Sequence, residues 1–164
     1  MAKDSSFDVV SEVDIQEATN AYQQAARELT ARYDLKQTGA ELDFNKQESS
    51  FLCTAPSEFV AGQVVDVLRA KLAKRGIDLS ALRIDEPIAS GGQVKQHIRL
   101  VQGIEKELAK RISKDVRDTK KKCKVSVEGD KLKVSSASRD TLQEIISFLK
   151  EQDYGQPLQF TNYR

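Results

Sequence analysis

At residues 40–55 the chain reads AELDFNKQESSFLCTA, with apolar and polar side chains alternating on both sides of a polar turn. Leu42 and Phe44 share one parity before the turn, and Phe51 and Cys53 share one parity after it. A period of two is typical of strands that bury one face of a sheet. This stretch therefore predicts a β-hairpin with one face in a hydrophobic core.

Helices are predicted on both sides of this hairpin. Asp14 is placed to cap the upstream helix, Ser57 to cap the downstream helix, and Gly76 to end the latter in a left-handed conformation. Short strands are expected at residues 7–10 and 82–84. The apolar helical stripes are Ile15, Ala18, Tyr22, Ala25 and Leu29, then Val60, Val64, Val67, Leu68 and Leu72.

The same order of elements recurs further along the chain. A strand at 94–101 precedes a helical stripe that starts at Ile104, two strands joined at Gly129-Asp130, a helix capped by Ser138 and a last strand at 158–161. Strand, helix, two strands, helix, strand supports an antiparallel four-stranded sheet with two helices on one face. The expected fold class is α+β, with two ferredoxin-like βαββαβ units.

The expected boundary between these units is the segment Ser90-Gly91-Gly92-Gln93, which follows Pro87 and has the composition of a linker. A cut there gives a first unit of residues 1–89 and a second of residues 90–164.

The composition excludes several classes of protein. Of 164 residues, 39% are hydrophobic and 31% charged, and no stretch approaches the roughly 20 apolar residues of a membrane span. The start of the chain lacks the apolar core of a signal peptide. We therefore expect a cytoplasmic protein without a membrane partner.

No catalytic or metal-binding constellation is expected. Cys53 and Cys123 match no metal or redox spacing and are expected as free, buried thiols, and His97 is the single histidine. No Walker loop, dinucleotide fingerprint or pair of nucleophile and base is present. We accordingly expect no catalytic residue, no metal and no cofactor.

Charge is distributed unevenly, although the net charge is only +1. Residues 1–60 carry 5 basic and 11 acidic groups, whereas residues 61–164 carry 21 and 14. Within the latter, residues 106–133 hold 11 basic and 5 acidic groups, a net charge of +6. Such asymmetry indicates an anionic partner, and a solvated lysine-rich surface is the alternative.

Ten cations are candidates for contacts with nucleotide or RNA phosphates. Lysine suits phosphate contacts, which give affinity but little sequence selectivity. Lys124, Lys131 and Lys133 share the polar parity of their strands and are expected on the open face of the second sheet. The cations near Gly76 have an alternative role, because they complement a helix dipole. The full set is Arg69, Lys71, Lys74, Arg75, Lys120, Lys121, Lys122, Lys124, Lys131 and Lys133.

Two other modes of action are disfavoured. The strand at Phe51 lacks the glycine and aromatic pattern with which many ferredoxin-like domains stack RNA bases. The loop Val101-Gln102-Gly103-Ile104 is similar to the phosphate loop of acylphosphatases, but Glu107 stands where that family has its phosphate-binding arginine. An acylphosphatase-like hydrolase is therefore the least favoured function.

Several segments, read in order, resemble the YajQ family of bacterial proteins over the whole chain. They are residues 6–14, residues 68–72 with 74–77, residues 102–104, residues 138–140 and residues 155–164. The resemblance implies two ferredoxin-like domains that exchange their first strands. The units would then be residues 14–101 and residues 1–13 plus 102–164.

The resemblance also implies nucleotide binding, association with RNA and, in some bacteria, sensing of cyclic di-GMP. It transfers no set of ligand residues, and the chain reads Gly91-Gly92-Gln93 where the family has a glycine followed by a lysine. The expected function is a non-catalytic nucleotide- or RNA-binding protein, with cyclic di-GMP as one candidate ligand. The alternative is a protein-interaction adaptor in which nucleotide binding is incidental.

Overall fold

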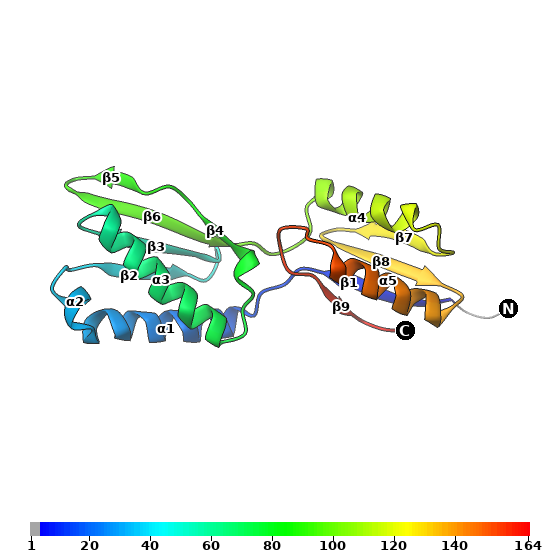
Figure 1. Ribbon diagram of the computed structural model, residues 1–164, viewed down its shortest axis with the longest axis horizontal. Coiled ribbons are helices and arrows are strands. Elements are labelled where there is room, and N and C mark those ends of the chain that lie inside the picture. Colours follow the sequence, from blue (N-terminus) through cyan, green and yellow to red (C-terminus); the bar gives the residue numbers. More distant parts are fainter. Residues whose placement is uncertain (1–3) are drawn as a thin grey trace. The chain divides into compact units, whose positions relative to one another are not determined.

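Two antiparallel sheets, each covered on one face by helices, make up the computed structural model, which describes residues 4–164 (Figure 1). The chain divides into two compact units. We call Val13–Val101 the central unit, and the segment ending at Glu12 together with Gln102–Arg164 the terminal unit. The chain passes from one unit to the other twice.

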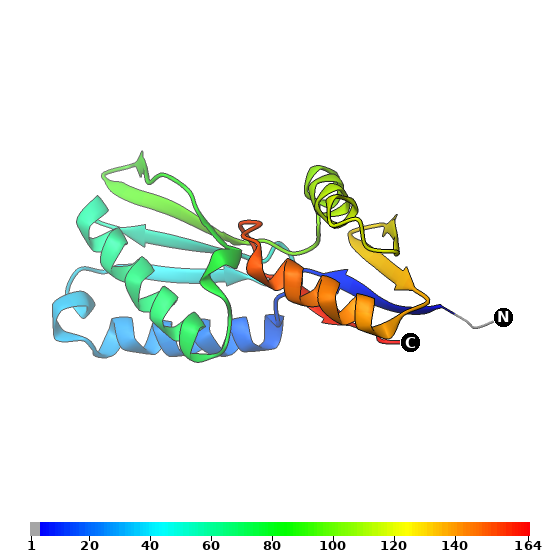
Figure 2. The same ribbon diagram turned by 45° about the vertical axis from the view of Figure 1, so that its right-hand side comes forward.

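The central unit has the sheet order β2-β3-β6-β4, with β5 pairing with the far end of β6. Its helices α1 and α3 lie on the same face of the sheet, as both ribbon views show (Figures 1 and 2). The elements are α1 (Ile15–Ala31), α2 (Tyr33–Lys36), β2 (Glu41–Asn45), β3 (Ser50–Ala55), α3 (Glu58–Lys74), a 3₁₀-helix (Leu79–Ala81), β4 (Leu82–Ile84), β5 (Ile88–Ser90) and β6 (Gln93–Leu100).

The terminal unit has the sheet order β7-β8-β1-β9, with all neighbours antiparallel. Its elements are β1 (Ser5–Val10), α4 (Lys106–Asp118), β7 (Lys124–Glu128), β8 (Lys131–Ser136), α5 (Arg139–Glu151) and β9 (Gln159–Thr161). An inner strand that lies between the second strand of the hairpin and the last strand is the arrangement of the ferredoxin-like fold. The predicted fold class, α+β with two ferredoxin-like units, is confirmed.

The first strands of the two βαββαβ patterns lie in each other's sheets. β1 pairs with β8 and β9, so that Phe7 stands opposite Val134 and Val9 opposite Phe160. β6 takes the matching inner place of the other sheet, where Ile98 stands opposite Phe51. Phe7 and Val9 are fully buried, so each sheet depends on a strand from a distant part of the sequence.

The helix boundaries follow the predicted caps. The side chains of Asp14, Ser57 and Ser138 accept hydrogen bonds from the amides of the residues three positions on. Gly76 has φ +81°, and the Ile77 amide donates to the Leu72 carbonyl at 3.0 Å, which closes α3 with a left-handed cap. Within residues 4–164, no helix combines the length and the apolar character that a membrane span needs.

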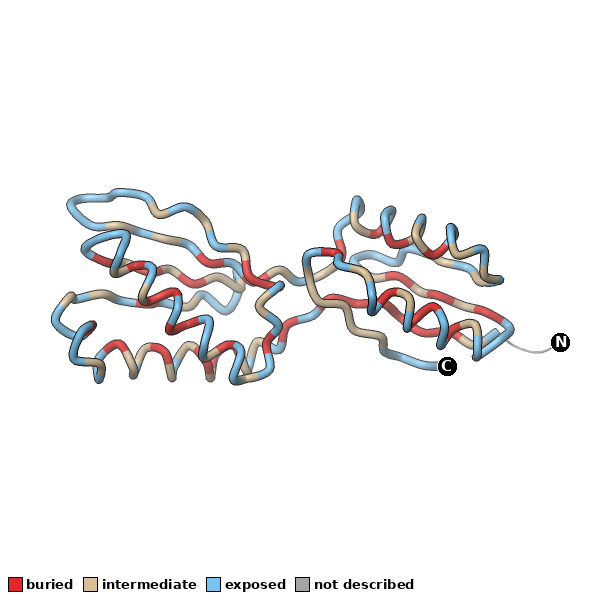
Figure 3. Tube along the Cα trace, viewed as in Figure 1, coloured by how far each residue is buried: buried red, intermediate tan, exposed pale blue. Residues whose placement is uncertain are grey.

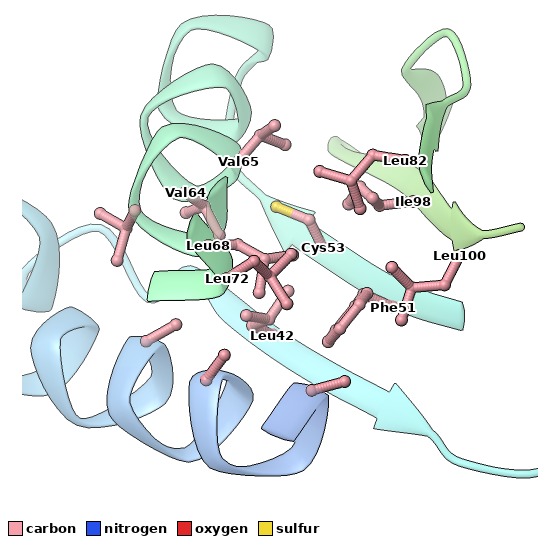
Figure 4. Packing of buried hydrophobic residues seen from close by; sticks show 14 of the residues in the cluster. Leu42, Phe51, Cys53, Val64, Val65, Leu68, Leu72, Leu82, Ile98 and Leu100 are labelled. Carbon is pink, nitrogen blue, oxygen red and sulfur yellow. The ribbon is translucent and has the colours of Figure 1, made fainter. Parts of the chain in front are cut away.

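Alternating burial along the strands builds the central core (Figure 3). Phe51 and Cys53 of β3 are fully buried beneath α3, where Leu68 and Leu72 pack onto them (Figure 4). The small side chains of Ala18, Ala21 and Ala25 on α1 face the same core. The predicted one-sided hairpin is therefore confirmed.

Ser90–Gln93 is not a linker, which corrects the expectation from its composition. Gly91 and Gly92 have φ values of +58° and +80°, and Ser90 pairs with Gln93 across a two-residue turn. A tight two-residue hairpin turn needs positive φ at both positions, which glycine adopts easily. A pair of glycines is therefore as compatible with a turn as with a flexible linker. β5, which we did not predict, is three residues long and exposed throughout.

Candidate phosphate-binding site

Four of the candidate lysines lie between the end of α4 and the first residue of β7 in the terminal unit. We call Lys120–Lys122 with Lys124 the lysine segment. α4 ends at Asp118, the Thr119 hydroxyl donates to the Val116 carbonyl at 2.6 Å, and Lys120 adopts φ +59°. The chain thus turns sharply and enters β7, the edge strand of the sheet. The turn concentrates the four side chains at one border of the unit.

Two clefts adjoin the lysine segment. The first, of about 440 Å³, lies against the start of α5. Its lining includes Lys121, Lys122 and Lys124, hydroxyl-bearing residues such as Ser135 and Ser138, and one carboxylate, Asp4. The second, of about 460 Å³, lies against α4 and is lined by Lys110, Arg117, Lys121, Lys124 and Val127, among others. Lys121, Cys123 and Lys124 line both clefts. The combination of several cations with hydroxyl groups suits phosphate oxygens.

The floor of the first cleft is held by its own hydrogen bonds. The Ser136 hydroxyl donates to the Lys122 carbonyl at 2.8 Å and accepts from the Ser138 amide at 3.1 Å. Lys121 makes an ion pair with Glu144 of α5. Lys122 and Lys124 are exposed and make no ion pair within the described residues. Two cations at this border are therefore unpaired within residues 4–164, and Lys121 can exchange its partner for a phosphate because Glu144 is exposed.

Lys131 and Lys133 lie on the open face of the terminal sheet, as predicted. Lys133 stands opposite Asp8 and Lys131 opposite Glu128 in the strand register. The Lys131 ammonium lies 3.3 Å from the Asp8 carboxylate. The same carboxylate accepts a hydrogen bond from the side-chain amide of Asn162 at 2.9 Å. The Asn162 hydrogen bond, and then the Lys131 ammonium, hold the pKa of Asp8 below its ordinary value. Asp8 therefore offsets much of the charge that Lys131 brings to this face.

The cations of α3 lie in the central unit and are partly engaged with α1. Lys71 pairs with Glu28 at 2.9 Å, and Arg75 pairs with Glu17 at 3.6 Å. The hydrogen bond from Lys71 lowers the pKa of Glu28. Arg69 and Lys74 are exposed. Half of this cluster thus joins two helices, and the cluster belongs to a different unit from the lysine segment.

A further basic row was missed in the sequence. Lys95, His97 and Arg99 of β6 alternate with the core-facing Ile98 side of the strand and point to the open face of the central sheet. Arg99 stands opposite Arg83 and pairs with Asp85 at 3.0 Å. The sequence does show this pattern, because the three basic residues occupy alternate positions on the polar side of the strand predicted at 94–101.

The loop at Gly103 is not arranged to hold an anion. The Gly103 amide donates to the Ser11 carbonyl at 2.6 Å, and the Ile104 amide donates to the Asp130 carbonyl at 2.8 Å. Gly103 has φ +85°, and a β-carbon there would meet the Asp130 carboxylate at 3.0 Å. These two amides are occupied by protein carbonyls, so the loop serves packing within the terminal unit.

A family model described as nucleotide-binding protein YajQ-like matches residues 5–164. The chain belongs to this family. It is 45% identical to a nucleotide-binding protein of Heliobacterium modesticaldum, over all of this chain and 99% of the relative. Nucleotide-binding proteins of Alkaliphilus oremlandii and Synechococcus elongatus are 46% and 47% identical, each with complete coverage of both chains.

In this YajQ-like chain, the reactivity of one free cysteine reports on access to the two clefts. Both cysteines are free; Cys53 is fully buried, whereas Cys123 is half-buried and lines both clefts. Burial raises the pKa of Cys53 to about 11 and also raises that of Cys123. The thiolate is the reactive form, so access and pKa both protect Cys53.

We expect an aromatic disulfide reagent to titrate one thiol in the native YajQ-like protein and two after denaturation. Cys123→Ser should abolish the native reaction, and Cys53→Ser should leave it unchanged. Spectrophotometry of the released thiol measures both. Native reaction of Cys53 at the rate seen in denaturant would contradict the burial described above.

Proposed function

We propose that this protein is a cytoplasmic, non-catalytic nucleotide- and RNA-binding protein, and that its lysine segment contacts the phosphates. Membership of the YajQ-like family and the names of its relatives support nucleotide binding. The observation that carries the location is the pair of clefts that share Lys121 and Lys124 at one border of the terminal unit. Exposed Lys122 adds a third cation to that border.

Contacts of this kind favour phosphate chains over particular bases. The open face of the terminal sheet adds Lys133 to the lysine segment. A long anion such as RNA engages several of these groups, whereas a mononucleotide engages few. Cyclic di-GMP carries two phosphates and is an intermediate case. We therefore propose RNA and cyclic dinucleotides as the ligands of the lysine segment.

The test is the salt dependence of binding. A fluorescently labelled single-stranded RNA and labelled cyclic di-GMP are titrated with the protein between about 50 and about 200 mM salt, and affinity is read from anisotropy. Three to four phosphate contacts on a single strand give a log–log slope of about −2 to −3, a loss of about 20- to 50-fold over that range. Absence of RNA binding at the lowest salt, or an affinity that does not change with salt, would refute the proposal.

A protein-interaction adaptor is the second candidate, because the central unit exposes large apolar side chains. Tyr33, Phe59 and Ile88 are 75%, 76% and 62% exposed. A stoichiometric partner that survives nuclease treatment and is lost in Phe59→Ser or Ile88→Ser would favour this function.

A further inference from the structure

A groove of about 370 Å³ runs between α5 and the end of the chain in the terminal unit, apart from the lysine segment. It is lined by Ser5, Ser6, Arg139, Leu142, Gln143, Tyr163 and Arg164. Among residues 4–164, no lysine lines this groove. Its volume lies in the range of pockets that hold small ligands.

A bulge at the end of β9 puts an aromatic ring into this groove. Thr161 stands opposite Asp8, yet Arg164 exchanges both backbone hydrogen bonds with Ser6, at 3.1 and 3.0 Å. From Thr161 to Arg164 is three residues, whereas from Asp8 to Ser6 is two, so the C-terminal strand contains one extra residue. Asn162, with φ +61°, forms the bulge. Without the bulge Tyr163 would point to the open face, because a shift of one residue exchanges the two faces of a strand.

Tyr163 offers one side of its ring to a ligand. Its centroid lies 6.4 Å from that of the fully buried Phe7, so the ring is supported by the core of the terminal unit. The side chain is nevertheless 61% exposed. A supported and exposed aromatic ring is a stacking platform for a nucleobase.

Arg139 brings a positive charge to the same groove from the first turn of α5. Its Nε donates to the Ser5 hydroxyl at 3.3 Å, which orients the guanidinium. Within residues 4–164 this is the one hydrogen bond of the side chain, so the two terminal nitrogens stay available for a bidentate contact with phosphate. Gln143, exposed on the next turn, supplies an amide that can donate and accept hydrogen bonds.

We propose that this groove binds a purine nucleoside 5′-phosphate, with the base stacked on Tyr163 and the phosphate on the Arg139 guanidinium. A purine is favoured over a pyrimidine because its two fused rings cover more of the tyrosine face. The inference rests on the proposed function, since it gives nucleotide binding by this chain a place for the base. It differs in predicting selectivity for a base, which the lysine segment does not provide.

The test is an NMR titration of the ¹⁵N-labelled full chain with AMP, adenosine and ribose 5-phosphate, followed at the amides of Ser5, Leu142 and Gln143. AMP should shift these amides. Adenosine and ribose 5-phosphate should each bind at least about tenfold more weakly than AMP. Tyr163→Ala should lower AMP affinity about tenfold, and Tyr163→Phe should retain it. Tyr33→Ala removes another exposed tyrosine, in the central unit, and should have no effect.

Two results would overturn this inference while leaving the proposed function in place. One is AMP affinity that is unchanged in Tyr163→Ala but reduced when Lys121, Lys122 and Lys124 are neutralised. The other is ribose 5-phosphate binding as tightly as AMP. If wild-type protein bound neither AMP nor RNA, both the groove and the lysine segment would be wrong.

Discussion

Replacement of Lys121, Lys122 and Lys124 by alanine should lower the affinity for single-stranded RNA on the order of 100-fold at low salt. The three amines line the clefts at β7, and a surface hydrogen bond with a charged partner is worth about 1 kcal/mol or more. Three such interactions correspond to roughly that factor. The log–log salt slope should fall by about 0.7 for each phosphate that the variant no longer binds, so by about 2.

The matched control removes the same charge from elsewhere in the terminal unit. Lys106, Lys114 and Lys150 are exposed and line neither cleft. Their triple alanine variant has the same net charge as the first and should lose only a few-fold in affinity. Equal losses in the two variants would show that overall charge, rather than the lysine segment, drives binding. Neither variant should change the unfolding midpoint greatly, because most of these side chains are exposed.

Phe51→Ala should destabilise the protein by about 3–5 kcal/mol, the usual cost of emptying a buried aromatic site. Phe51 is fully buried, and its ring stacks on Phe44 with centroids 4.4 Å apart. It also stands opposite Ile98, the fully buried residue among the six of β6 that pair with β3. Loss of this ring therefore weakens the attachment of a strand as well as the packing of α3.

Urea denaturation followed by circular dichroism measures this cost. Phe59→Ala is the matched control. Phe59 lies in the first turn of α3 but is 76% exposed, so its replacement should change stability by less than about 0.5 kcal/mol. A Phe51→Ala variant as stable as Phe59→Ala would mean that the central core is not centred on β3.

Local patterns in the sequence predict most of the secondary structure. The alternation around Phe51 gives β2 and β3, and short polar side chains before apolar stripes give the starts of α1, α3 and α5. These signals act over a few residues, so a single sequence contains them. The glycine pair at Gly91 is ambiguous, because a hairpin turn and a linker make the same demand on the backbone.

The exchange of first strands is not contained in the periodicity. β1 and β6 both offer an apolar face, and either could fill the inner place of either sheet as far as alternation is concerned. Only the family resemblance implied that residues 7–10 belong to the sheet of the second unit, where Phe7 stands opposite Val134. That choice depends on contacts between residues more than a hundred positions apart.

In the candidate site, too, local features can be predicted from the sequence and long-range contacts cannot. The lysines of the terminal unit are visible as charge, but their neutralising partners are remote. Asp8 lies 123 positions from Lys131, and Glu144 lies 23 positions from Lys121. The groove at Tyr163 depends on a one-residue bulge, which no composition or spacing reveals. Charge could thus be predicted from the sequence, whereas its pairing and the direction of single side chains required the fold.

The most direct test of the lysine segment as the RNA contact is an NMR titration of the full chain with a short single-stranded RNA at low salt. We predict shifts concentrated at the amides of residues 117–125 and 135–141, with progressive loss as salt is raised. Shifts confined to α3 and β6 of the central unit, with the lysine segment unchanged, would contradict it.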